Sequence, residues 1–363
     1  MSDKIFVSTG EVSGDLHLSY IAKHILEEDP SVKIYGVAGE HSKAVGVEII
    51  QDIKELAIMG FVEVISKYGF LKRKAREYVD FIKKERVNKV ILVDYGGFNL
   101  RFLQLLKEEA PKVEIFYYIP PKVWVWGEKR VEKIKMADHI VVIFPWEVEF
   151  YKKHGVDVVY YGNPFVEKYE KVQEIGESIL LLPGSRKQEI KTIFPEMLKV
   201  VKAIPEKKFI VKLSSREHVQ WIDEDLSKIK NLKLEFDMNL KECVSVSQIA
   251  IATSGTVTLE LALLGIPTVV VYKGNPINAF IARKFLNIGF ISLPNLTLNE
   301  EVFPELIQER CTAKEIIHAM NAILQDRKLV TKKIENVRQK LSGEHITKKY
   351  AQYILEGKKD EEI

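Results

Sequence analysis

The chain has 363 residues, enough for two ordinary domains with a core each. With 46% hydrophobic and 29% charged residues, its composition is that of a globular protein and excludes a disordered chain. A net charge of +3 is too small to indicate nucleic acid as a partner.

The first half of the chain alternates short apolar strands with amphipathic helices. The strands are predicted at residues 4–8, 33–38, 89–93, 113–119, 139–144 and 156–161. A helix follows the first strand, and others are predicted near residues 72–86, 99–109, 127–136 and 145–154. This alternation indicates a parallel sheet covered on both faces. Ligands of such sheets bind beyond the carboxyl ends of the strands.

The second half repeats the plan. Strands are predicted at residues 179–182, 209–213, 232–236, 249–252 and 268–272, with helices between them and a mostly helical tail from Thr312. We therefore predict an α/β protein with two doubly wound, Rossmann-like domains that face a central cleft. The expected domains are residues 1–163 and 164–335, followed by a helical tail at 336–363, with a hinge near Tyr160–Pro164.

A glycine turn rich in acidic residues follows the first strand, at Thr9–His17. It matches neither the Rossmann nor the Walker phosphate pattern. Glu11 and Asp15 make it unsuitable for phosphate but suitable for sugar hydroxyls or proton transfer. Capping of the following helix by Ser13 and Asp15 explains the same residues equally well.

Asp94 is the first choice for a general base. It follows the buried strand 89–93, at the edge where ligands bind, and the glycine pair Gly96–Gly97 leaves room for a sugar to approach. The loop Pro120–Trp126 ends the next strand at the same edge. Glu11 and Asp15 are the next candidates for the base.

The second half contains a turn suited to phosphate. Pro183 and Gly184 break the strand that ends at Leu182, and Ser185 is expected to cap a helix that begins near Lys187. Backbone N–H groups at such a helix start favour an anion, and Arg186 adds a guanidinium that can form paired bonds to phosphate oxygens. An ordinary strand-to-helix turn with a surface arginine remains the alternative.

A second turn of this kind follows the strand 249–252. Ser254, Gly255 and Thr256 lie at the start of the next helix, and Glu260 is one turn further on among apolar neighbours. The Glu260 carboxylate could accept hydrogen bonds from a ribose diol, or it could be a solvated helix position. Two such turns in one half of the chain predict a nucleoside diphosphate ligand.

Residues 58–71 are apolar and aromatic but are interrupted by glycines, and a basic stretch follows them. Residues 72–89 contain eight lysines or arginines and three acidic residues. An apolar segment beside a cationic face suits a membrane surface or an acidic lipid, here through Met59 to Arg76. Core residues followed by a solvated basic helix are the alternative, which charge and hydrophobicity alone favour.

Neither cysteines nor targeting segments suggest an oxidising or membrane-spanning context. Cys243 and Cys311 show no metal-ligand or redox spacing, and no apolar run reaches the length of a bilayer. The N-terminus lacks a signal-peptide pattern, so we expect a cytoplasmic protein. The one Asp-x-Asp run, Asp223–Asp225, lies in a charged stretch and has the pattern of a solvated helix start. No metal is expected.

Six motifs together resemble the lipid-A-disaccharide synthase family. They are GEVSGDLH at Gly10–His17, ELAIMGFVEV at Glu55–Val64, YIPPKVWVWGEKRV at Tyr118–Val131, LLPGSR at Leu181–Arg186, ATSGTVTLE at Ala252–Glu260 and SLPNL at Ser292–Leu296. The resemblance implies an inverting glycosyltransferase of the glycosyltransferase-B architecture. It also implies that Asn295, in the last motif, and Glu260 contact the nucleotide.

The resemblance implies specific substrates as well. The family transfers a diacylated glucosamine from its UDP carrier to the 6-hydroxyl of diacylglucosamine 1-phosphate and releases UDP, with no cofactor. Peripheral association with the inner membrane is expected, and a second copy of the chain is a candidate partner. Where the family has a D-A-P-D-F-N run, this chain has Gly97 in place of the second aspartate, so the role of base falls on Asp94, Glu11 or Asp15.

Two alternatives remain open at this point. A UDP-N-acetylglucosamine 2-epimerase has the same architecture but needs no surface for lipid. A protein that only binds a nucleotide sugar or a lipid would bind UDP without releasing any from an acylated donor.

Overall fold

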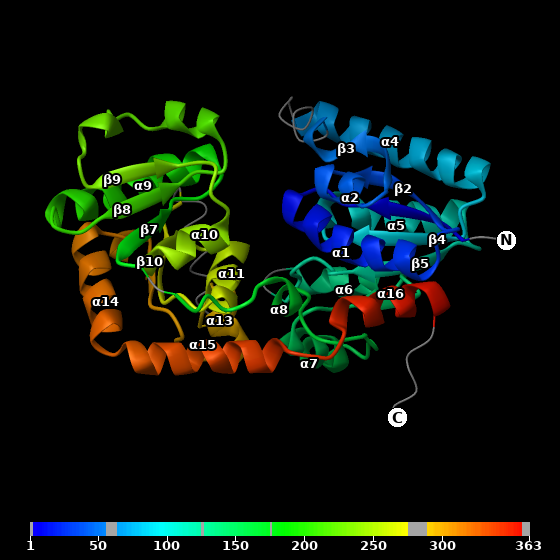
Figure 1. Cartoon of the computed structure of the whole chain (residues 1–363). Helices are drawn as coiled ribbons and strands as arrows, with labels where there is room; N and C mark the ends of the chain where they lie inside the picture. The colour runs from blue at the N-terminus through cyan, green and yellow to red at the C-terminus, as the bar shows by residue number, and fades with distance from the viewer. Residues whose placement is uncertain (1–2, 56–63, 125–126, 175, 275–288, 358–363) are drawn as a thin grey trace. The chain divides into compact units, whose positions relative to one another are not determined.

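The structure, a computed structural model of the whole chain, describes residues 3–55, 64–124, 127–174, 176–274 and 289–357 (Figure 1). For residues 64–68 it describes the helical backbone only. The chain forms two compact units. Unit 1 comprises Met1–Pro164 and Gly343–Ile363, and unit 2 comprises Phe165–Ser342.

Unit 1 is built on a six-stranded sheet in the order β3-β2-β1-β4-β5-β6. Its strands are β1 (Lys4–Ser8), β2 (Lys33–Ala38), β3 (Glu48–Asp52), β4 (Lys89–Val93), β5 (Glu114–Tyr118) and β6 (His139–Val141). All pairs are parallel, and β1 and β4 are paired at the centre with Val7 opposite Ile91. The order reverses between β1 and β4, so the binding edge of this sheet is expected at their carboxyl ends.

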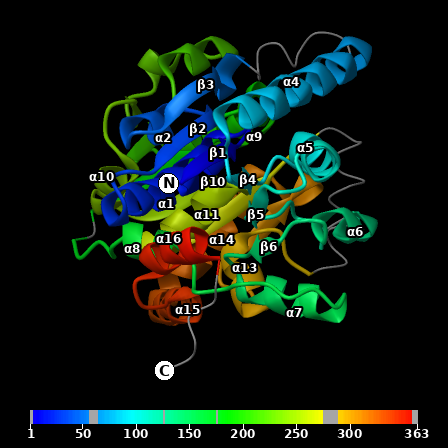
Figure 2. The same ribbon diagram turned by 90° about the vertical axis from the view of Figure 1, so that its right-hand side faces the viewer.

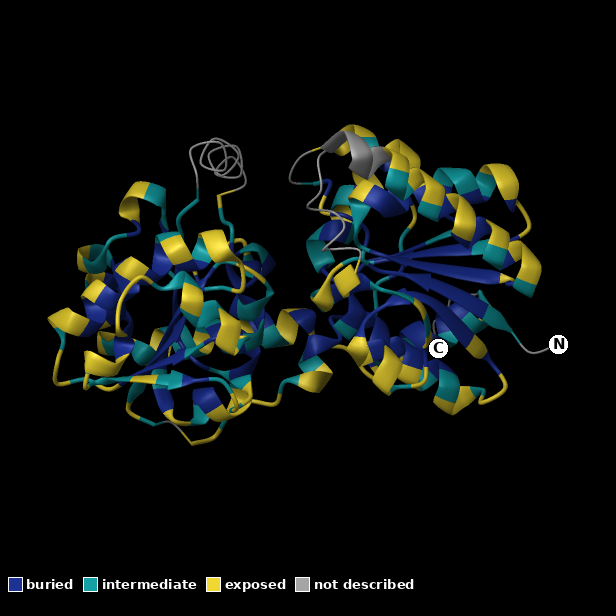
Figure 3. Cartoon of the chain, turned by 90° about the horizontal axis from the view of Figure 1, so that it is seen from above, coloured by how far each residue is buried: buried dark blue, intermediate teal, exposed yellow. Residues whose placement is uncertain are grey.

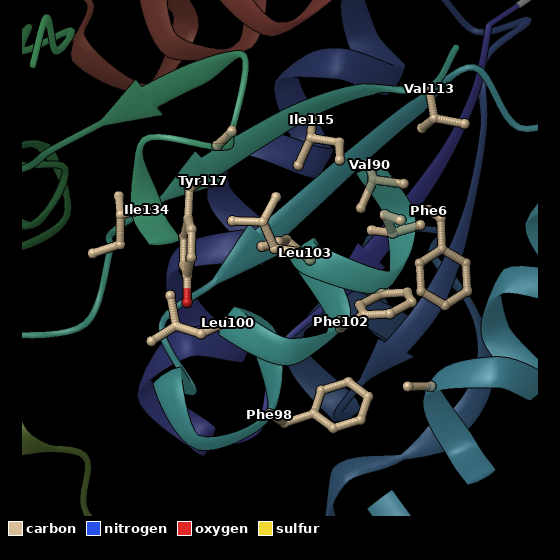
Figure 4. Packing of buried hydrophobic residues seen from close by; sticks show 14 of the residues in the cluster. Phe6, Val90, Phe98, Leu100, Phe102, Leu103, Val113, Ile115, Tyr117 and Ile134 are labelled. Carbon is tan, nitrogen blue, oxygen red and sulfur yellow. The ribbon is translucent and has the colours of Figure 1, made fainter. Parts of the chain in front are cut away.

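Helices cover both faces of this sheet. They are α1 (Val12–Glu28), α2 (Glu40–Ala44), α4 (Val64–Glu85), α5 (Gly96–Glu109), α6 (Val131–Ile134), α7 (Pro145–Lys153) and α16 (Ile346–Glu356), with the short helix η1 at Glu128–Arg130. α1 and α16 lie side by side (Figure 2). A core cluster that includes Phe6, Phe102 and Tyr117 joins the sheet to α5 (Figure 4).

Unit 2 repeats the topology. Its sheet has the order β12-β11-β10-β7-β8-β9. The strands are β7 (Ser178–Leu182), β8 (Phe209–Lys212), β9 (Leu232–Glu235), β10 (Ser247–Thr253), β11 (Thr268–Tyr272) and β12 (Glu305–Ile307). Here β7 and β10 are the central pair, with Leu180 opposite Ala250. Numbered within the unit, the order is the same as in unit 1, so the order reverses again at the central pair.

The helices of unit 2 pack against the sheet from both sides. They are α8 (Phe165–Lys168), α9 (Lys187–Ala203), α10 (Leu240–Ser245), α11 (Thr256–Leu264), α13 (Leu293–Leu298), α14 (Ala313–Gln325) and α15 (Arg327–Leu341), with short helices at Arg216–Trp221, Leu226–Lys228 and Gln308–Arg310. Alternate residues of β7 divide between two core clusters. Ile179 and Leu181 enter one, and Leu180 and Leu182 the other. Figure 3 shows buried residues along the strands of both sheets, in dark blue.

The predicted fold class is confirmed, with differences in single elements. β3 and β12 were not predicted, since both are short edge strands with polar residues. The predicted strand at 156–161 is wrong: only Val159 bridges to Val141. The predicted helix at 72–86 begins earlier, at Val64, with Gly69 in its interior.

The C-terminal segment is divided between the units. α15 ends at Leu341 in unit 2, whereas α16 belongs to unit 1, so residues 336–363 do not form one separate tail. The buried hydroxyl of Tyr350 on α16 lies 2.9 Å from the carbonyl oxygen of Val142 and 2.8 Å from that of Gly162. These contacts fix α16 to the body of unit 1.

α4 carries the described part of the stretch predicted to face a membrane. Phe70 and Leu71 are partly buried against the core of unit 1, and Phe61 and Val62 lie outside the described residues. Phe70 and Leu71 therefore pack against the core, as the alternative to a membrane-facing segment predicted. Within the described ranges, no helix combines the length and apolar character needed to cross a bilayer.

Candidate active site

Four of the turns singled out in the sequence lie at the reversal points of the two sheets. In unit 1 they follow β1 and β4 and carry Glu11, Asp15 and Asp94. In unit 2 they follow β7 and β10 and carry the turns 183–186 and 254–256. Each unit therefore has its own candidate site at the carboxyl ends of its central strands.

Asp94 is held in a strained backbone conformation. Its φ is 44° and that of Tyr95 is 46°, in the left-handed region that non-glycine residues rarely adopt. The Asp94 N–H donates to the carbonyl of Ile119 at 3.0 Å, and its carbonyl accepts from the Asn99 amide and the Tyr117 hydroxyl, both at 3.0 Å. Such strain costs about 1–3 kcal/mol per residue and persists where the surroundings fix it, often at functional sites.

Asn99 is a site residue that the sequence reading did not select. Its side chain is fully buried, and its oxygen accepts a hydrogen bond from the Ser8 hydroxyl at 2.7 Å. Its amide nitrogen donates to the carbonyls of Ser8, Val93 and Asp94. One side chain thus ties the ends of β1 and β4 together.

The environment of Asp94 makes its carboxyl suitable for proton transfer near neutral pH. Burial raises the pKa of Asp94 to about 6, and the negative charge of Glu11 adds to the increase. The Lys122 ammonium and the Tyr95 N–H act in the opposite direction on this pKa. A general base works best when its pKa is close to the working pH, so Asp94 fits the role predicted for it.

Asp15, in contrast, has a structural role as a helix cap. It is buried, and its carboxylate accepts hydrogen bonds from the backbone N–H groups of Gly39 at 2.8 Å, His41 at 3.0 Å and Ser42 at 3.3 Å. These N–H groups surround the start of α2. Asp15 therefore caps α2, a different helix from the one that the sequence suggested.

Glu11 lies at the N-cap position of α1 and is exposed, without a side-chain hydrogen bond to the helix. Its charge acts on both Asp94 and Tyr95. A Cβ at Gly10 would lie 2.2 Å from the Tyr95 ring, so only glycine allows this close approach between the two turns. The structure thus brings Glu11 and Asp94 together.

A second buried carboxyl in unit 1, Glu147, was not predicted as a site residue. It lies in the first turn of α7, where it accepts from the Trp124 indole at 3.3 Å and the Phe144 N–H at 3.2 Å. Burial raises the pKa of Glu147 to about 7, while Trp124, nearby backbone N–H groups and Lys122 lower it. The positive charge of Lys122 therefore acts on two carboxyls, Glu147 and Asp94. Phe144 stands where a capping box has serine or threonine, so the sequence carries no clear signal for Glu147.

In unit 2 the turn after β7 has the predicted shape but a different cap. Gly184 has φ +106°, and the N–H groups of Ser185 and Arg186 both donate to Glu189 Oε2 at 3.3 Å. The predicted cap, Ser185, is therefore wrong, because Glu189 reaches back and Arg186 occupies the N-cap position. The Arg186 guanidinium is exposed and lies 3.2 Å from Glu189. The Glu189 carboxylate therefore accepts hydrogen bonds from the same backbone N–H groups that a bound anion would use.

In the part of the chain that the structure describes, no side chain caps the helix that follows β10. Gly255 is the N-cap residue of α11, with no capping hydrogen bond from a side chain. The Ser254 hydroxyl donates to the carbonyl of Ile291 at 3.3 Å, and Thr256 is the first residue of the helix. The first N–H groups of a helix favour an anion, and anion binding at this turn stays a prediction.

The two remaining predicted residues, Glu260 and Asn295, differ in their surroundings. Glu260 is partly buried and accepts a hydrogen bond from the Tyr169 hydroxyl at 2.6 Å. Asn295 is fully buried, donates to Phe303 and Glu305, and accepts from Val302 and Phe303. Its hydrogen bonds hold α13 against β12, so any effect on a ligand is indirect.

Among the described residues, no group of three or more histidine, cysteine, aspartate or glutamate side chains could hold a metal ion. Asp225, in the only Asp-x-Asp run, caps a short helix through Ser227 and pairs with Lys228 at 3.2 Å.

Comparison with known proteins identifies the family. The family model described as lipid-A-disaccharide synthetase matches residues 5–356. The chain is 33% identical to the lipid-A-disaccharide synthase of Geobacter metallireducens, with 98% of each chain covered. It is 32% identical to that of Sulfurihydrogenibium sp., with 90% of each covered.

Solved structures share the fold at low identity. The UDP-GlcNAc 2-epimerase of Neisseria meningitidis, bound to UDP-GlcNAc, has a TM-score of 0.66 at 13% identity, covering 98% of this chain and 100% of that one. MurG of Acinetobacter baumannii has a TM-score of 0.57 at 14% identity, covering 98% and 99%. Such likeness shows the fold alone, so it does not favour the epimerase alternative. The match over nearly the whole length, to the family model and to relatives above 30% identity, shows that the chain belongs to the lipid-A-disaccharide synthase family of glycosyltransferases.

Proposed function

We propose that this enzyme transfers a 2,3-diacylglucosamine from UDP to the 6-hydroxyl of 2,3-diacylglucosamine 1-phosphate, with inversion at the anomeric carbon. The observation that carries the proposal is Asp94, a carboxyl with a raised pKa, held by a strained backbone at the reversal point of a Rossmann-like sheet. A primary alcohol needs such a base as it attacks.

The proton and the leaving group follow separate routes in this mechanism. The acceptor oxygen attacks the anomeric carbon while its proton passes to Asp94. The bond from that carbon to the diphosphate breaks, and UDP leaves with the electron pair. Glu11, exposed beside Asp94, is the second candidate for the base, whereas the three amide hydrogen bonds of Asp15 favour a structural role.

The departing diphosphate is assigned to unit 2. Its negative charge would be stabilised by Arg186 and by the N–H groups of the turns 184–186 and 254–256, as preorganised electrostatics. Glu189 holds the N–H groups of the first turn in this structure, so the diphosphate would have to displace its carboxylate. Glu260 is proposed to accept a hydrogen bond from the ribose.

These groups supply positive charge without a metal ion, so we propose a reaction independent of divalent cations. The decisive assay combines the chain with both acylated sugars and measures UDP release. A parallel incubation with UDP-N-acetylglucosamine alone tests for an epimerised product. Release of UDP that needs both sugars supports the transferase. Epimerisation without UDP release would refute it.

Peripheral membrane association through residues 59–76 is a further part of the proposal. Lys72, Arg73 and Arg76 are exposed on α4, and Arg73 lies 5.7 Å from the centre of the Phe70 ring. Exposed cationic side chains attract anionic lipid head groups. Cosedimentation with vesicles that contain phosphatidylglycerol tests this point. Dimer formation stays a prediction that ultracentrifugation tests.

A further inference from the structure

A hydrogen bond joins the beginning of unit 2 to the helix that carries the proposed ribose contact. Tyr169 follows α8, and its hydroxyl donates to Oε2 of Glu260 on α11 at 2.6 Å. Burial raises the pKa of Glu260, and the hydrogen bond from Tyr169 lowers it. The phenol therefore favours the ionised form of a carboxyl whose burial favours the neutral form.

The backbone of Tyr169 is fixed in its own right. The guanidinium of Arg338, on α15, donates to the carbonyl oxygen of Tyr169, to that of Val166 at 3.2 Å and to that of Leu263 at 2.7 Å. Leu263 lies in the last turn of α11, the helix of Glu260. One side chain thus links the segment of Tyr169 to α11, so the phenol is held over Glu260 by two separate contacts.

We propose that Tyr169 is a positioning residue for the nucleotide. It holds one carboxylate oxygen of Glu260 and so directs the other, Oε1, to accept a hydrogen bond from the ribose 2′-hydroxyl of UDP. This inference rests on the nucleotide role proposed above for Glu260. Acidic residues of dinucleotide-binding Rossmann domains contact the same hydroxyl.

The hydrogen bond from the phenol is important because the terminal torsion of a glutamate side chain does not fix the orientation of its carboxylate. This torsion is broad, so without the hydrogen bond the carboxylate would sample many orientations. A preorganised acceptor loses less freedom when a ligand binds. Selection of a ribonucleotide over a deoxyribonucleotide follows, because only the ribonucleotide offers the 2′-hydroxyl.

Calorimetric titration of the full chain with UDP and with 2′-deoxyuridine 5′-diphosphate tests the inference. The wild type should bind UDP about 10- to 100-fold more tightly than the deoxy form, the range for one hydrogen bond to a charged group. Tyr169→Phe should weaken UDP binding about 5- to 20-fold and deoxy binding much less, which narrows the preference. Glu170→Gln is the matched control, because Glu170 pairs with Lys241 on the surface and its loss should change neither affinity.

Two further measurements separate positioning from simple stabilisation of the fold. In a Glu260→Gln background, Tyr169→Phe should cause no additional loss of UDP affinity, since the phenol acts through that carboxylate. In the transfer assay, Tyr169→Phe should raise KM for the donor with little change in kcat.

The opposite results are distinct. If Tyr169→Phe lowers the melting temperature but leaves both affinities unchanged, the contact is structural and the inference is wrong, while the nucleotide site stands. An equal loss of UDP affinity in the Glu260→Gln background would also refute it. If the wild type does not bind UDP at all, the proposed function fails, and the inference with it.

Discussion

Substitution of Asp94 by asparagine tests the proposed base most directly. The amide keeps the size of the side chain but cannot accept the proton of the acceptor hydroxyl. We expect kcat to fall by about 10²–10⁴-fold, the range for loss of a general base. UDP affinity should not change, since the nucleotide contacts are proposed in unit 2. Steady-state kinetics with both acylated sugars and calorimetry with UDP measure the two quantities.

The same substitution should stabilise the protein at higher pH. Burial raises the pKa of Asp94 from 3.8 to about 6, so folding favours the protonated form. The contribution of protonated Asp94 to the free energy of unfolding is fully present below pH ~3.8 and is lost as the pH rises through ~6. At 1.36 kcal/mol for each pKa unit, the ionised carboxylate costs at most about 3 kcal/mol above this window. Asparagine avoids that cost, so the gain in free energy of unfolding should be near zero at pH 4 and largest at pH 8 in urea titrations.

Neighbouring charges provide the matched controls. Wild-type kcat should increase with pH through about 6 as Asp94 loses its proton. Glu11→Gln should move this increase in kcat to lower pH, because the charge of Glu11 raises the pKa of Asp94. Lys122→Met should move it to higher pH, because the charge of Lys122 lowers that pKa. A near-normal rate in Asp94→Asn, together with a collapsed rate in a folded Glu11→Gln or Asp15→Asn variant, would refute our assignment.

Three other predictions concern the nucleotide, the metal and the membrane. Arg186→Ala should weaken UDP binding about 10- to 100-fold in calorimetry. Lys191→Ala, at an exposed position one turn further along α9, is the control and should not weaken it. Equal effects of the two substitutions would argue against phosphate binding at the turn 183–186. Transfer should continue in excess chelator, and a loss of activity that magnesium restores would overturn metal independence. Replacing Lys72, Arg73 and Arg76 together by glutamine should reduce sedimentation with anionic vesicles at low salt and leave UDP affinity intact. Unchanged sedimentation would remove α4 from the membrane proposal.

The fold could be predicted because its central strands carry an unmistakable pattern. β4 is buried at every position, and β10 is buried at nearly all, so both appear as continuous apolar runs between amphipathic helices. β3 lacks this signal because an edge strand has one paired side and its sequence, Glu48–Asp52, is mostly polar. Turn positions followed from the strands, since ligand sites lie at strand ends.

The partners of the site residues could not be predicted, because their hydrogen bonds join distant parts of the chain. Ser8 and Asn99 are 91 residues apart, as are Tyr169 and Glu260, and Trp124 is 23 residues from Glu147. No local pattern encodes such pairs.

A local pattern also gave a wrong prediction where two side chains could bind the same backbone N–H groups. Ser185 matches the preference for a cap, but the longer side chain of Glu189 reaches the same N–H groups. Asn295 belongs to a motif of the family, yet its amide is fully used by the backbone around Val302 and Phe303 and by Glu305. The cap prediction for Ser185 is therefore wrong, whereas the nucleotide contact of Asn295 stays a prediction for a side chain that its neighbours already engage.

In the proposed mechanism, one topology supports opposite chemistry in the two units. Both place a turn after each of two central parallel strands, so the backbone frame is the same. In unit 1 the turns carry carboxyls, and burial with a nearby negative charge keeps the Asp94 pKa high enough to take a proton. In unit 2 the turns offer helix N–H groups and the guanidinium of Arg186, which favour negative charge. A transferase needs both, a base for the entering oxygen and positive charge for the leaving diphosphate, and the repeated fold can supply them separately because side chains rather than backbone set the charge of each edge.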